Sequence, residues 1–378
     1  MIAKRIQDLP PYLFARIDKL KAEARARGAD LIDLGIGDPD LPTPPHVVEA
    51  LAQAARKPEH HRYPSYEGMR AYREACARFM KRRFSVELDP EREIVALIGS
   101  KEGIAHLAWA LVDPGDRVAC PDPGYPVYAT TARFAGGEVV PIPLTREHGF
   151  RPAGPPPLPL KLAWLCFPNN PTGATVSRDF YASTAEWARE HGVVIGSDLA
   201  YSEIYFDGPP PPSFLEVGKD VGIEFHSLSK TFNMTGWRVG WACGRADVVA
   251  ALGKVKTNVD SGVFEAVQAA AIAALDGDPA FAEGMRRIYR ERRDVLVDGL
   301  AKLGFDVIRP AASFYVLCGV PAGMTSLDFA TRLLEETAIV AAPATGFGPG
   351  GEGFVRFALT QSKERIAEAV ERMSKLKI

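Results

Sequence analysis

The sequence predicts an α/β protein with one large, mainly parallel sheet and a second, smaller α+β domain, and three observations support this prediction. Several short runs are apolar without alternation, which is typical of strands buried on both faces. Segments with helical periodicity separate most of these runs, as in strand-helix-strand units. From residue 279 a long amphipathic helix pattern replaces this rhythm. It marks the start of the second unit.

The length and composition agree with such a fold. The chain has 378 residues, 47% of them hydrophobic and 24% charged. At about 150 residues per domain this is enough for two to three domains with a large core. The net charge of −2 does not attract nucleic acid or anionic lipid, so we expect neither as a partner.

Cysteine usage and hydropathy favour a cytoplasmic protein. The five cysteines are odd in number and form no Cys-x-x-Cys pair, which argues against a disulfide framework and a zinc site. The longest mostly apolar stretch, residues 266–275, falls short of the roughly 20 residues that cross a bilayer. The start, MIAKRIQDLPPYLF, lacks the uninterrupted apolar core of a secretory signal.

Seven apolar runs predict the strands of the large sheet, at residues 93–98, 117–120, 138–143, 160–167, 193–198, 222–227 and 239–243. Helical patterns lie between them, for example at residues 101–112, 125–134, 180–191 and 246–254. After the long helix at 279–303 the pattern is strand, strand, helix, strand, strand, helix. The arginine-rich run 286–293 is expected to form the solvent face of that helix. In open α/β sheets ligands bind beyond the carboxyl ends of the strands, so residues directly after each run are site candidates.

Two of these strand ends carry turn sequences. Gly99-Ser100-Lys101 follows the first run and opens a helix, where free N–H groups and the helix dipole favour an anion. An ordinary glycine-rich turn is the alternative. The second, which contains Asn169 and Asn170, is either a self-contained turn or a source of amides for a ligand.

Two further strand ends carry charges. Asp198 closes a buried run, where a carboxylate needs a cation beside it; a structural ion pair is the alternative. Lys230 lies in Ser227-Leu228-Ser229-Lys230, where burial would lower the amine pKa from about 10.4 and leave a nucleophile able to form a Schiff base. Ser227, Ser229 and Arg238 would complete an anion cradle, with the arginine as a forked donor.

These features describe one ligand, with an anionic phosphate, an aldehyde facing the lysine and a ring nitrogen facing the carboxylate. Pyridoxal 5′-phosphate has these parts. The stretches LGIGDPDLPTPP, HRYPSYEGMRAYREA, GSKEGIAHL, PDPGYPVY, PNNPTGA, AYSEIYFDG, EFHSLSKTFNMTGWRVG and NVDSGVF resemble the class I/II aminotransferases of fold type I. Within that family they look most like the LL-diaminopimelate aminotransferase subgroup.

The resemblance implies a role for each matching residue. Lys230 would form the Schiff base with the cofactor and move the substrate proton. Asp198 would keep the pyridine nitrogen protonated, and Tyr201 with Asn170 would bond the ring oxygen. The catalytic set is therefore Lys230, Asp198 and Tyr201, and Tyr125 would stack on the ring.

The same resemblance supplies the phosphate and substrate contacts. The phosphate would be held by Ser100, Lys101, Ser227 and Arg238, with Ser229 beside them, and by a partner subunit's Tyr63, which implies a homodimer. The substrate side would be formed by Arg356, Gly37, Asn170 and Tyr125, with Arg356 clamping the α-carboxylate. Candidate positions for reading the rest of the substrate are Tyr66, Lys101, Glu102 and Tyr128.

The implied fold has a large cofactor-binding domain at residues 46–283 and a small domain built from both chain ends, residues 1–45 and 284–378. The implied function is a ping-pong transfer of an amino group between an amino acid and a 2-oxo acid. The preferred pair is LL-diaminopimelate and 2-oxoglutarate, in lysine biosynthesis. The alternatives are a glutamate, alanine or aspartate aminotransferase of the same family, a pyridoxal-phosphate β-lyase, and a cofactor-binding regulator without turnover.

Two tempting patterns receive structural interpretations. His60-His61 lacks further ligands at metal-site spacing, and we interpret it as a solvated turn without a metal. Gly35-x-Gly37 lacks the third glycine of a dinucleotide fingerprint, so it does not indicate NAD.

Overall fold

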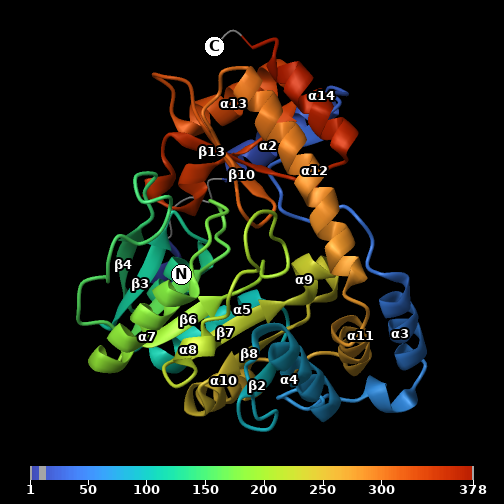
Figure 1. Ribbon diagram of the computed structural model, residues 1–378, viewed down its shortest axis with the longest axis vertical. Coiled ribbons are helices and arrows are strands. Elements are labelled where there is room, and N and C mark those ends of the chain that lie inside the picture. The colour runs from blue at the N-terminus through green and yellow to red at the C-terminus, as the bar shows by residue number, and fades with distance from the viewer. Residues whose placement is uncertain (1, 8–13, 377–378) are drawn as a thin grey trace.

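The computed structural model describes residues 2–7 and 14–376. They form a large sheet region and a smaller one, joined by the long helix α12 (Ala280–Lys302) that runs between them in Figure 1. This arrangement confirms the predicted α/β fold with a second, smaller sheet domain. The placement of the domain boundary at residues 45/46 and 283/284 remains a prediction.

The large sheet has seven strands in the order β2-β8-β7-β6-β5-β3-β4. Their bounds are β2 (Ile94–Leu97), β3 (Arg117–Asp122), β4 (Glu138–Pro143), β5 (Leu162–Cys166), β6 (Val194–Asp198), β7 (Gly222–Ser227) and β8 (Gly240–Gly244). Only β8 runs antiparallel to its neighbours, and the other pairs are parallel. All seven predicted strands are present, since runs of apolar residues in both pleat positions require cover on both faces.

Helices cover both faces of this sheet. They are α3 (Pro45–Ala55), α4 (Arg70–Phe84), α5 (Ser100–Leu111), α6 (Val127–Phe134), α7 (Arg178–His191), α8 (Leu215–Gly218), α10 (Ala246–Val259) and α11 (Glu265–Leu275). Strand residues alternate between two buried clusters: Trp241 joins the cluster that contains Phe79 of α4, and Ala242 joins the one that contains Leu107 of α5. The two clusters therefore lie on opposite faces.

The smaller region combines both ends of the chain. Its four-stranded antiparallel sheet has the order β12-β13-β10-β9, with β9 (Val307–Ile308), β10 (Tyr315–Gly319), β12 (Ala342–Pro343) and β13 (Phe354–Ala358). Near the start of the chain, β1 (Ile32–Asp33) pairs in parallel with β11 (Ile339–Val340). The helices here are α2 (Phe14–Ala26), α13 (Ser326–Thr337) and α14 (Lys363–Met373).

Short elements complete the chain. They are the helices α1 (Lys4–Gln7) and α9 (Leu228–Thr231), and the 3-10 turns η1 (Pro58–His61), η2 (Thr235–Trp237), η3 (Ala344–Phe347) and η4 (Pro349–Gly351). Within residues 2–7 and 14–376, no helix combines the length and the apolar character that crossing a membrane requires.

The solvent-face interpretation of the arginine run on α12 is wrong for two of its members. Arg292 and Arg293 are only 4% and 3% exposed. Arg292 forms a two-pronged ion pair with Asp40, at 2.7 and 2.8 Å, and Arg293 pairs with Asp207. Charge runs predict exposure only where no other segment covers the helix, and here chain segments supply both carboxylates.

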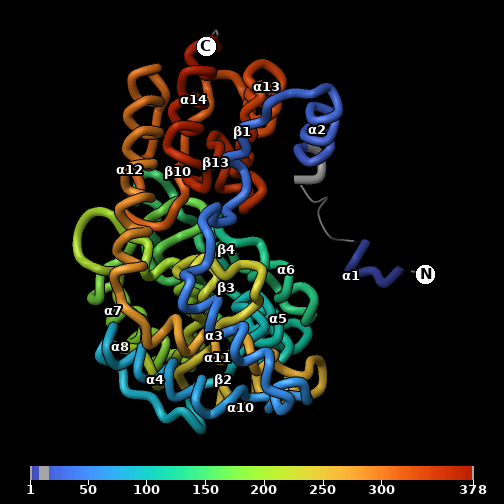
Figure 2. The backbone as a smooth tube through the Cα atoms, turned by 90° about the vertical axis from the view of Figure 1, so that its right-hand side faces the viewer, coloured from blue at the N-terminus to red at the C-terminus, as the bar shows by residue number. Residues whose placement is uncertain are grey.

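Asp40 belongs to the connecting segment, residues 34–43, which Figure 2 shows passing between the two regions. The small region holds its start, because the Ala358 amide donates to the Leu34 carbonyl at 2.6 Å. The large region holds its end, because the Thr43 hydroxyl donates to the Asn233 carbonyl at 2.9 Å. The segment is thus fixed at both ends.

The two histidines of η1 differ in environment. His60 is 7% exposed, and its Nδ1 lies 2.9 Å from the Ala54 carbonyl. His61 is exposed and lies against the Ala55 carbonyl. The solvated-turn interpretation is therefore wrong for His60, whose ring closes the end of α3.

Candidate active site

Most of the predicted site residues meet where the large sheet faces the small one. Asp198 is the last residue of β6, and Asn170 follows β5 in the chain. From the small region, β10 supplies Tyr315 and β13 supplies Arg356. The parallel strands place their carboxyl ends at this edge, which is where ligands bind in open α/β sheets.

Asp198 is a buried carboxylate without a cationic partner. Its side chain accepts hydrogen bonds from the Tyr128 hydroxyl at 2.6 Å and the Ala200 amide at 3.3 Å. Within residues 2–7 and 14–376, no ion pair involves it. Burial raises its pKa to about 6. A protonated ring nitrogen in front of this carboxylate would supply the missing positive charge.

Tyr128 takes a different position from the substrate-facing one considered above. Its hydroxyl is bonded to Asp198, and its ring stacks on Trp164 with the centroids 4.9 Å apart. The side chain is 1% exposed. Tyr128 therefore positions the Asp198 carboxylate instead of contacting the substrate.

Lys230 lies in the short helix α9, directly after β7. Its Nζ donates to the Gly37 carbonyl at 2.7 Å and lies 5.7 Å from the centre of the Phe314 ring. Burial lowers the pKa of the amine to about 8. A large fraction of the amine is therefore neutral and nucleophilic in mildly alkaline solution.

Arg356 is a buried cation, and no carboxylate forms an ion pair with it within residues 2–7 and 14–376. Its Nη1 donates to Asn170 Oδ1 at 2.8 Å, and its Nη2 donates to the Gly35 carbonyl at 2.7 Å. The guanidinium lies between two rings, 4.0 Å from the centre of Tyr315 and 4.4 Å from that of Phe347. Its Nε has no hydrogen-bond partner in the part of the chain that the structure describes. A buried, unpaired guanidinium suits a ligand carboxylate.

A cradle for an anion lies at the start of α5. Gly99 caps this helix without a side-chain hydrogen bond and has φ +74°, and a Cβ there would collide with Arg238. At Gly240 a Cβ would lie 3.3 Å from the Ser100 amide nitrogen and 3.5 Å from the Ser227 Cα. The helix amides, the serine and the arginine therefore border one small space, as an anion site requires.

The remaining cradle residues have local contacts. The Ser227 hydroxyl accepts a hydrogen bond from the Ser229 amide at 3.2 Å, which caps α9. Arg238 donates to the Thr235 carbonyl at 2.8 Å. The Lys101 ammonium lies 5.9 Å from the centre of the Tyr125 ring.

Tyr125 and Tyr201 complete the set close to Asp198 and Arg356. The Tyr125 ring meets the Tyr128 ring edge to face, with the centroids 5.8 Å apart. The Tyr201 hydroxyl lies 3.0 Å from the Tyr315 hydroxyl. Burial raises the pKa of Tyr201, so this phenol is protonated at neutral pH.

Three candidates lie apart from this group. Tyr63 is 88% exposed and Tyr66 is 43% exposed, and neither side chain has a hydrogen bond to the site residues within the described ranges. Glu102 instead accepts a hydrogen bond from the Ile98 amide at 2.9 Å and faces Lys256 at 3.2 Å. Its carboxylate is thus already engaged.

Two aromatic residues of the site escaped prediction. Tyr315 and Phe347 enclose the Arg356 guanidinium. Tyr315 occurs in an apolar stretch, where an aromatic residue normally signals core, and Phe347 occurs in the glycine-rich segment 344–353. The pairing of β10 with β13 places Tyr315 opposite Ala358, two residues from Arg356. No local pattern in the sequence reveals that proximity.

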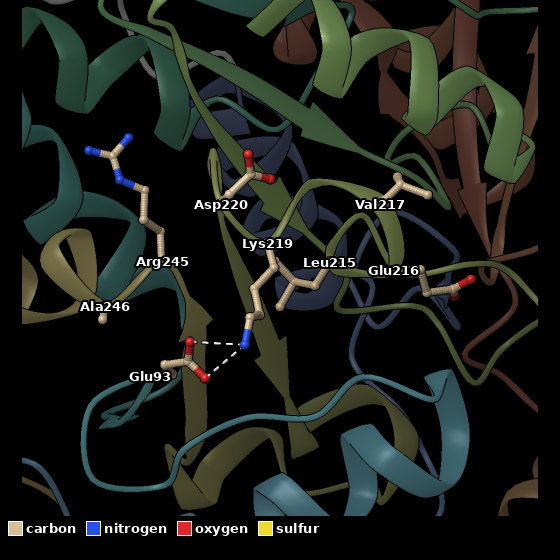
Figure 3. A pocket seen from close by; sticks show the side chains of 8 residues that line it. All are labelled: Glu93, Leu215, Glu216, Val217, Lys219, Asp220, Arg245 and Ala246. Atoms are coloured by element: carbon tan, nitrogen blue, oxygen red, sulfur yellow. Dashed lines mark hydrogen bonds and ion pairs between the residues drawn. The ribbon is translucent and has the colours of Figure 1, made fainter. Parts of the chain in front are cut away.

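A surface cleft lies elsewhere. It has a volume of about 470 Å³ and is lined by charged and apolar side chains that include Glu93, Lys219, Asp220 and Arg245 (Figure 3). Lys219 pairs with Glu93 at 3.0 Å, and Arg245 pairs with Asp247 at 2.6 Å. This cleft is near the amino end of β7, at the edge of the sheet opposite Asp198, and its cations already have partners.

The donor set fits pyridoxal 5′-phosphate. A buried carboxylate lacking a cation matches the ring nitrogen, and an amine with lowered pKa matches the aldehyde. A helix start beside Arg238 matches the phosphate. Each of these groups would bind one part of that molecule.

Comparison with known proteins agrees with this geometry. Residues 29–373 match the family described as aminotransferase class I and II. The LL-diaminopimelate aminotransferase of Desulforudis audaxviator is 54% identical, over 98% of this chain and 96% of that protein. The LL-diaminopimelate aminotransferase of Moorella thermoacetica is 52% identical, over 99% and 98%.

Solved structures extend the comparison to the fold. The apo form of BacF from Bacillus subtilis superposes with a TM-score of 0.96 at 38% identity, covering 100% of this chain and 98% of that one. An aspartate aminotransferase single mutant from Thermus thermophilus superposes with a TM-score of 0.93 at 32% identity, covering 99% of each chain.

Proposed function

Because this chain belongs to the class I and II aminotransferases, which depend on pyridoxal 5′-phosphate, we propose that it transfers an amino group from LL-diaminopimelate to 2-oxoglutarate in lysine biosynthesis. Its substrates are amino acids and 2-oxo acids. The choice of diaminopimelate is supported by relatives of that name that are 50 to 54% identical over nearly the whole chain.

The observation that supports amino-group transfer most directly is the unpaired Arg356 guanidinium close to the amine of Lys230. The Lys230 amine bonds the Gly37 carbonyl, and the Tyr315 side chain borders both Gly37 and the Arg356 guanidinium, so the two cations face the same space. A carboxylate bound at Arg356 would place its α-amino group and Cα toward Lys230. This is the geometry that an α-amino acid substrate requires.

The cofactor would supply an aldehyde for the amino group and a ring that withdraws electrons from Cα. Lys230 would hold the cofactor through its amine and would accept the proton released from the substrate Cα. Asp198, which accepts a hydrogen bond from Tyr128, would keep a proton on the ring nitrogen. Arg356 and Asn170 orient the substrate carboxylate, with the backbone at Gly37 alongside.

The cofactor contacts follow from the cradle described above. The amides of Ser100 and Lys101, the Ser227 hydroxyl and the Arg238 guanidinium would hold the phosphate, with Ser229 next to them. Tyr201 and Asn170 would bond the ring oxygen, and the Tyr125 ring would cover one face of the cofactor. These assignments combine the family resemblance with the positions of the residues.

We also propose that the enzyme is a homodimer of the cytoplasm. Tyr63 is 88% exposed within one subunit, a cost for a large aromatic side chain that burial against a partner would remove. In the proposed dimer it reaches the phosphate of the neighbouring subunit. We propose no nucleic-acid or membrane partner.

A half-reaction screen tests the substrate proposal. The purified holoenzyme is mixed separately with LL-diaminopimelate, alanine, aspartate and glutamate, and the loss of the cofactor absorbance at about 420 nm is followed. We expect the fastest conversion with LL-diaminopimelate. Conversion by glutamate and alanine but not by LL-diaminopimelate would still indicate an aminotransferase. It would overturn the proposed role in lysine biosynthesis.

Two controls separate the remaining alternatives. Release of ammonia and pyruvate without a 2-oxo acid would identify a β-lyase. A Lys230→Ala variant should lose both the absorbance band and turnover, since no other lysine occupies this position. Normal turnover by that variant would contradict the proposed mechanism.

A further inference from the structure

Tyr315 touches three groups of the proposed site and was not singled out by the sequence. It is 3% exposed at the start of β10. Its hydroxyl lies 3.0 Å from the Tyr201 hydroxyl, and its ring centre lies 4.0 Å from the Arg356 guanidinium. A Cβ added at Gly37 would overlap its hydroxyl, so Tyr315 also borders the backbone that accepts the Lys230 hydrogen bond.

The hydroxyl of Tyr315 can set the direction of hydrogen bonding at Tyr201. Each phenol has one proton to donate. If Tyr315 donates to Tyr201, the proton of Tyr201 is left for a ligand. Burial and the neighbouring Tyr315 both raise the pKa of Tyr201, so Tyr201 keeps the proton that it would donate to the ring oxygen.

The ring of Tyr315 acts on a different group. Arg356 is stacked between Tyr315 and Phe347, at 4.0 and 4.4 Å. Ring faces attract a guanidinium without neutralising it. The two rings therefore keep the Arg356 guanidinium in one plane and leave its charge available to a substrate carboxylate. An acidic side chain in their place would neutralise that charge.

We propose that Tyr315 is a positioning residue with two separable roles: its hydroxyl orients Tyr201 toward the cofactor, and its ring orients Arg356 toward the substrate carboxylate. The inference rests on the proposed function, because it assigns the cofactor to Tyr201 and the carboxylate to Arg356. The two roles predict different defects when the hydroxyl or the whole ring is removed.

Tyr315→Phe removes the hydroxyl alone and keeps the ring. Weaker donation by Tyr201 would leave more negative charge on the ring oxygen of the cofactor. That oxygen would then hold the proton on the Schiff-base nitrogen of Lys230 more tightly. We expect the pH midpoint of the cofactor absorbance change to rise by about half to one unit. The amino-acid concentration for half-maximal conversion should change less than about twofold, because the ring still covers Arg356.

A double-mutant cycle with Tyr201→Phe tests the first role. Tyr201→Phe should raise the same midpoint at least as much as Tyr315→Phe does. In the Tyr201→Phe background, Tyr315→Phe should add no further shift, since its effect passes through Tyr201. Additive shifts, or no shift in Tyr315→Phe, would overturn the role of the hydroxyl.

Tyr315→Leu tests the second role and removes the ring. We expect half-saturation by the amino acid to rise about tenfold or more, with a smaller fall in the limiting rate. Phe347→Leu, which removes the opposite ring, should show the same pattern. Unchanged half-saturation in a Tyr315→Leu protein that retains the cofactor band would overturn the role of the ring.

The Lys230→Ala variant separates failure of this inference from failure of the proposed function. If that variant, freed of amino acids, keeps the absorbance band, Lys230 does not form the Schiff base and the proposed assignment of the site is wrong. If it loses the band while the Tyr315 variants behave like the unmodified enzyme, the function stands and the positioning role fails. Should Tyr315→Leu fail to fold, the nearly isosteric Tyr315→Phe and its cycle with Tyr201→Phe still decide the hydroxyl role.

Discussion

At the scale of single residues, Lys230 differs from an ordinary surface lysine through its surroundings. Burial lowers the pKa of its amine to about 8, and the charges of Arg356 and Arg238 act in the same direction, while Asp38 opposes them. No carboxylate forms an ion pair with it in the described ranges 2–7 and 14–376. The amine is therefore prepared as a nucleophile before any ligand arrives.

This pKa predicts how the cofactor rebinds. The pKa lies below the ordinary 10.5 of lysine, so the neutral amine becomes dominant above about pH 8. We expect the rate at which apoenzyme regains the absorbance band, after addition of pyridoxal 5′-phosphate, to rise through about pH 8 and level off above it. Asp198, with a pKa of about 6, is ionised across this range and should not shape the curve.

The control for this experiment is the apoenzyme of Lys230→Ala, which should show no band at any pH. A rate that keeps rising through pH 10 would mean that the amine behaves like an exposed lysine. That outcome would contradict the assignment of the pKa to burial in the site.

At the scale of elements, α5 and α10 are joined by a buried ionic cluster, formed by Glu102, His106, Lys256 and Asp260. The Lys256 side chain is 0% exposed, and its Nζ lies 3.2 Å from both Glu102 oxygens and 3.1 Å from the nearer Asp260 oxygen. Glu102, His106 and Asp260 are grouped closely enough to ligate a metal, but the ammonium of Lys256 already contacts both carboxylates. The cluster fixes the first turn of α5, where the proposed phosphate cradle lies.

Lys256→Met should therefore weaken both the fold and the cradle. It leaves two carboxylates facing each other without their shared cation, which costs about 3 to 5 kcal/mol. We expect denaturant unfolding of the apoenzyme to show this loss, and titration with pyridoxal 5′-phosphate to show weaker binding. Lys254→Met, at an exposed position of the same helix, should change the unfolding free energy by less than about 0.5 kcal/mol. Equal unfolding free energies of the two variants would argue against a stabilising role for the cluster.

Also at the element scale, the sequence predicted some features well and others poorly for identifiable reasons. Strands buried on both faces leave continuous apolar runs, so all seven strands of the large sheet could be located. Polar residues at the ends of such runs stand out from the apolar pattern, so Asp198 and Lys230 could be predicted as site candidates. Tyr315 escaped because its partners come from other elements, and Arg292 was misplaced because its carboxylate, Asp40, lies 252 residues away.

At the scale of the whole molecule, the site depends on both regions. The large sheet supplies Asp198 and the helix start at Ser100, and the small sheet supplies Arg356 and Tyr315. The connecting segment is bonded to both regions and also accepts the Lys230 hydrogen bond through Gly37. A change in the relative placement of the two regions would therefore alter the distance from the amine to the carboxylate clamp.

The proposed dimer extends this dependence to a second subunit and gives a test by complementation. Homodimers of Lys230→Ala should be inactive, and homodimers of Tyr63→Ala should bind the cofactor weakly. In a hybrid dimer, one site would combine an intact Lys230 with an intact Tyr63 from the partner, while the other would carry both defects. Random reassortment of equal amounts makes about half of the dimers hybrid, so we expect about a quarter of the unmodified activity to return. Activity that stays at the average of the two parent variants would show that Tyr63 serves its own subunit, and would rule out a site shared through this residue.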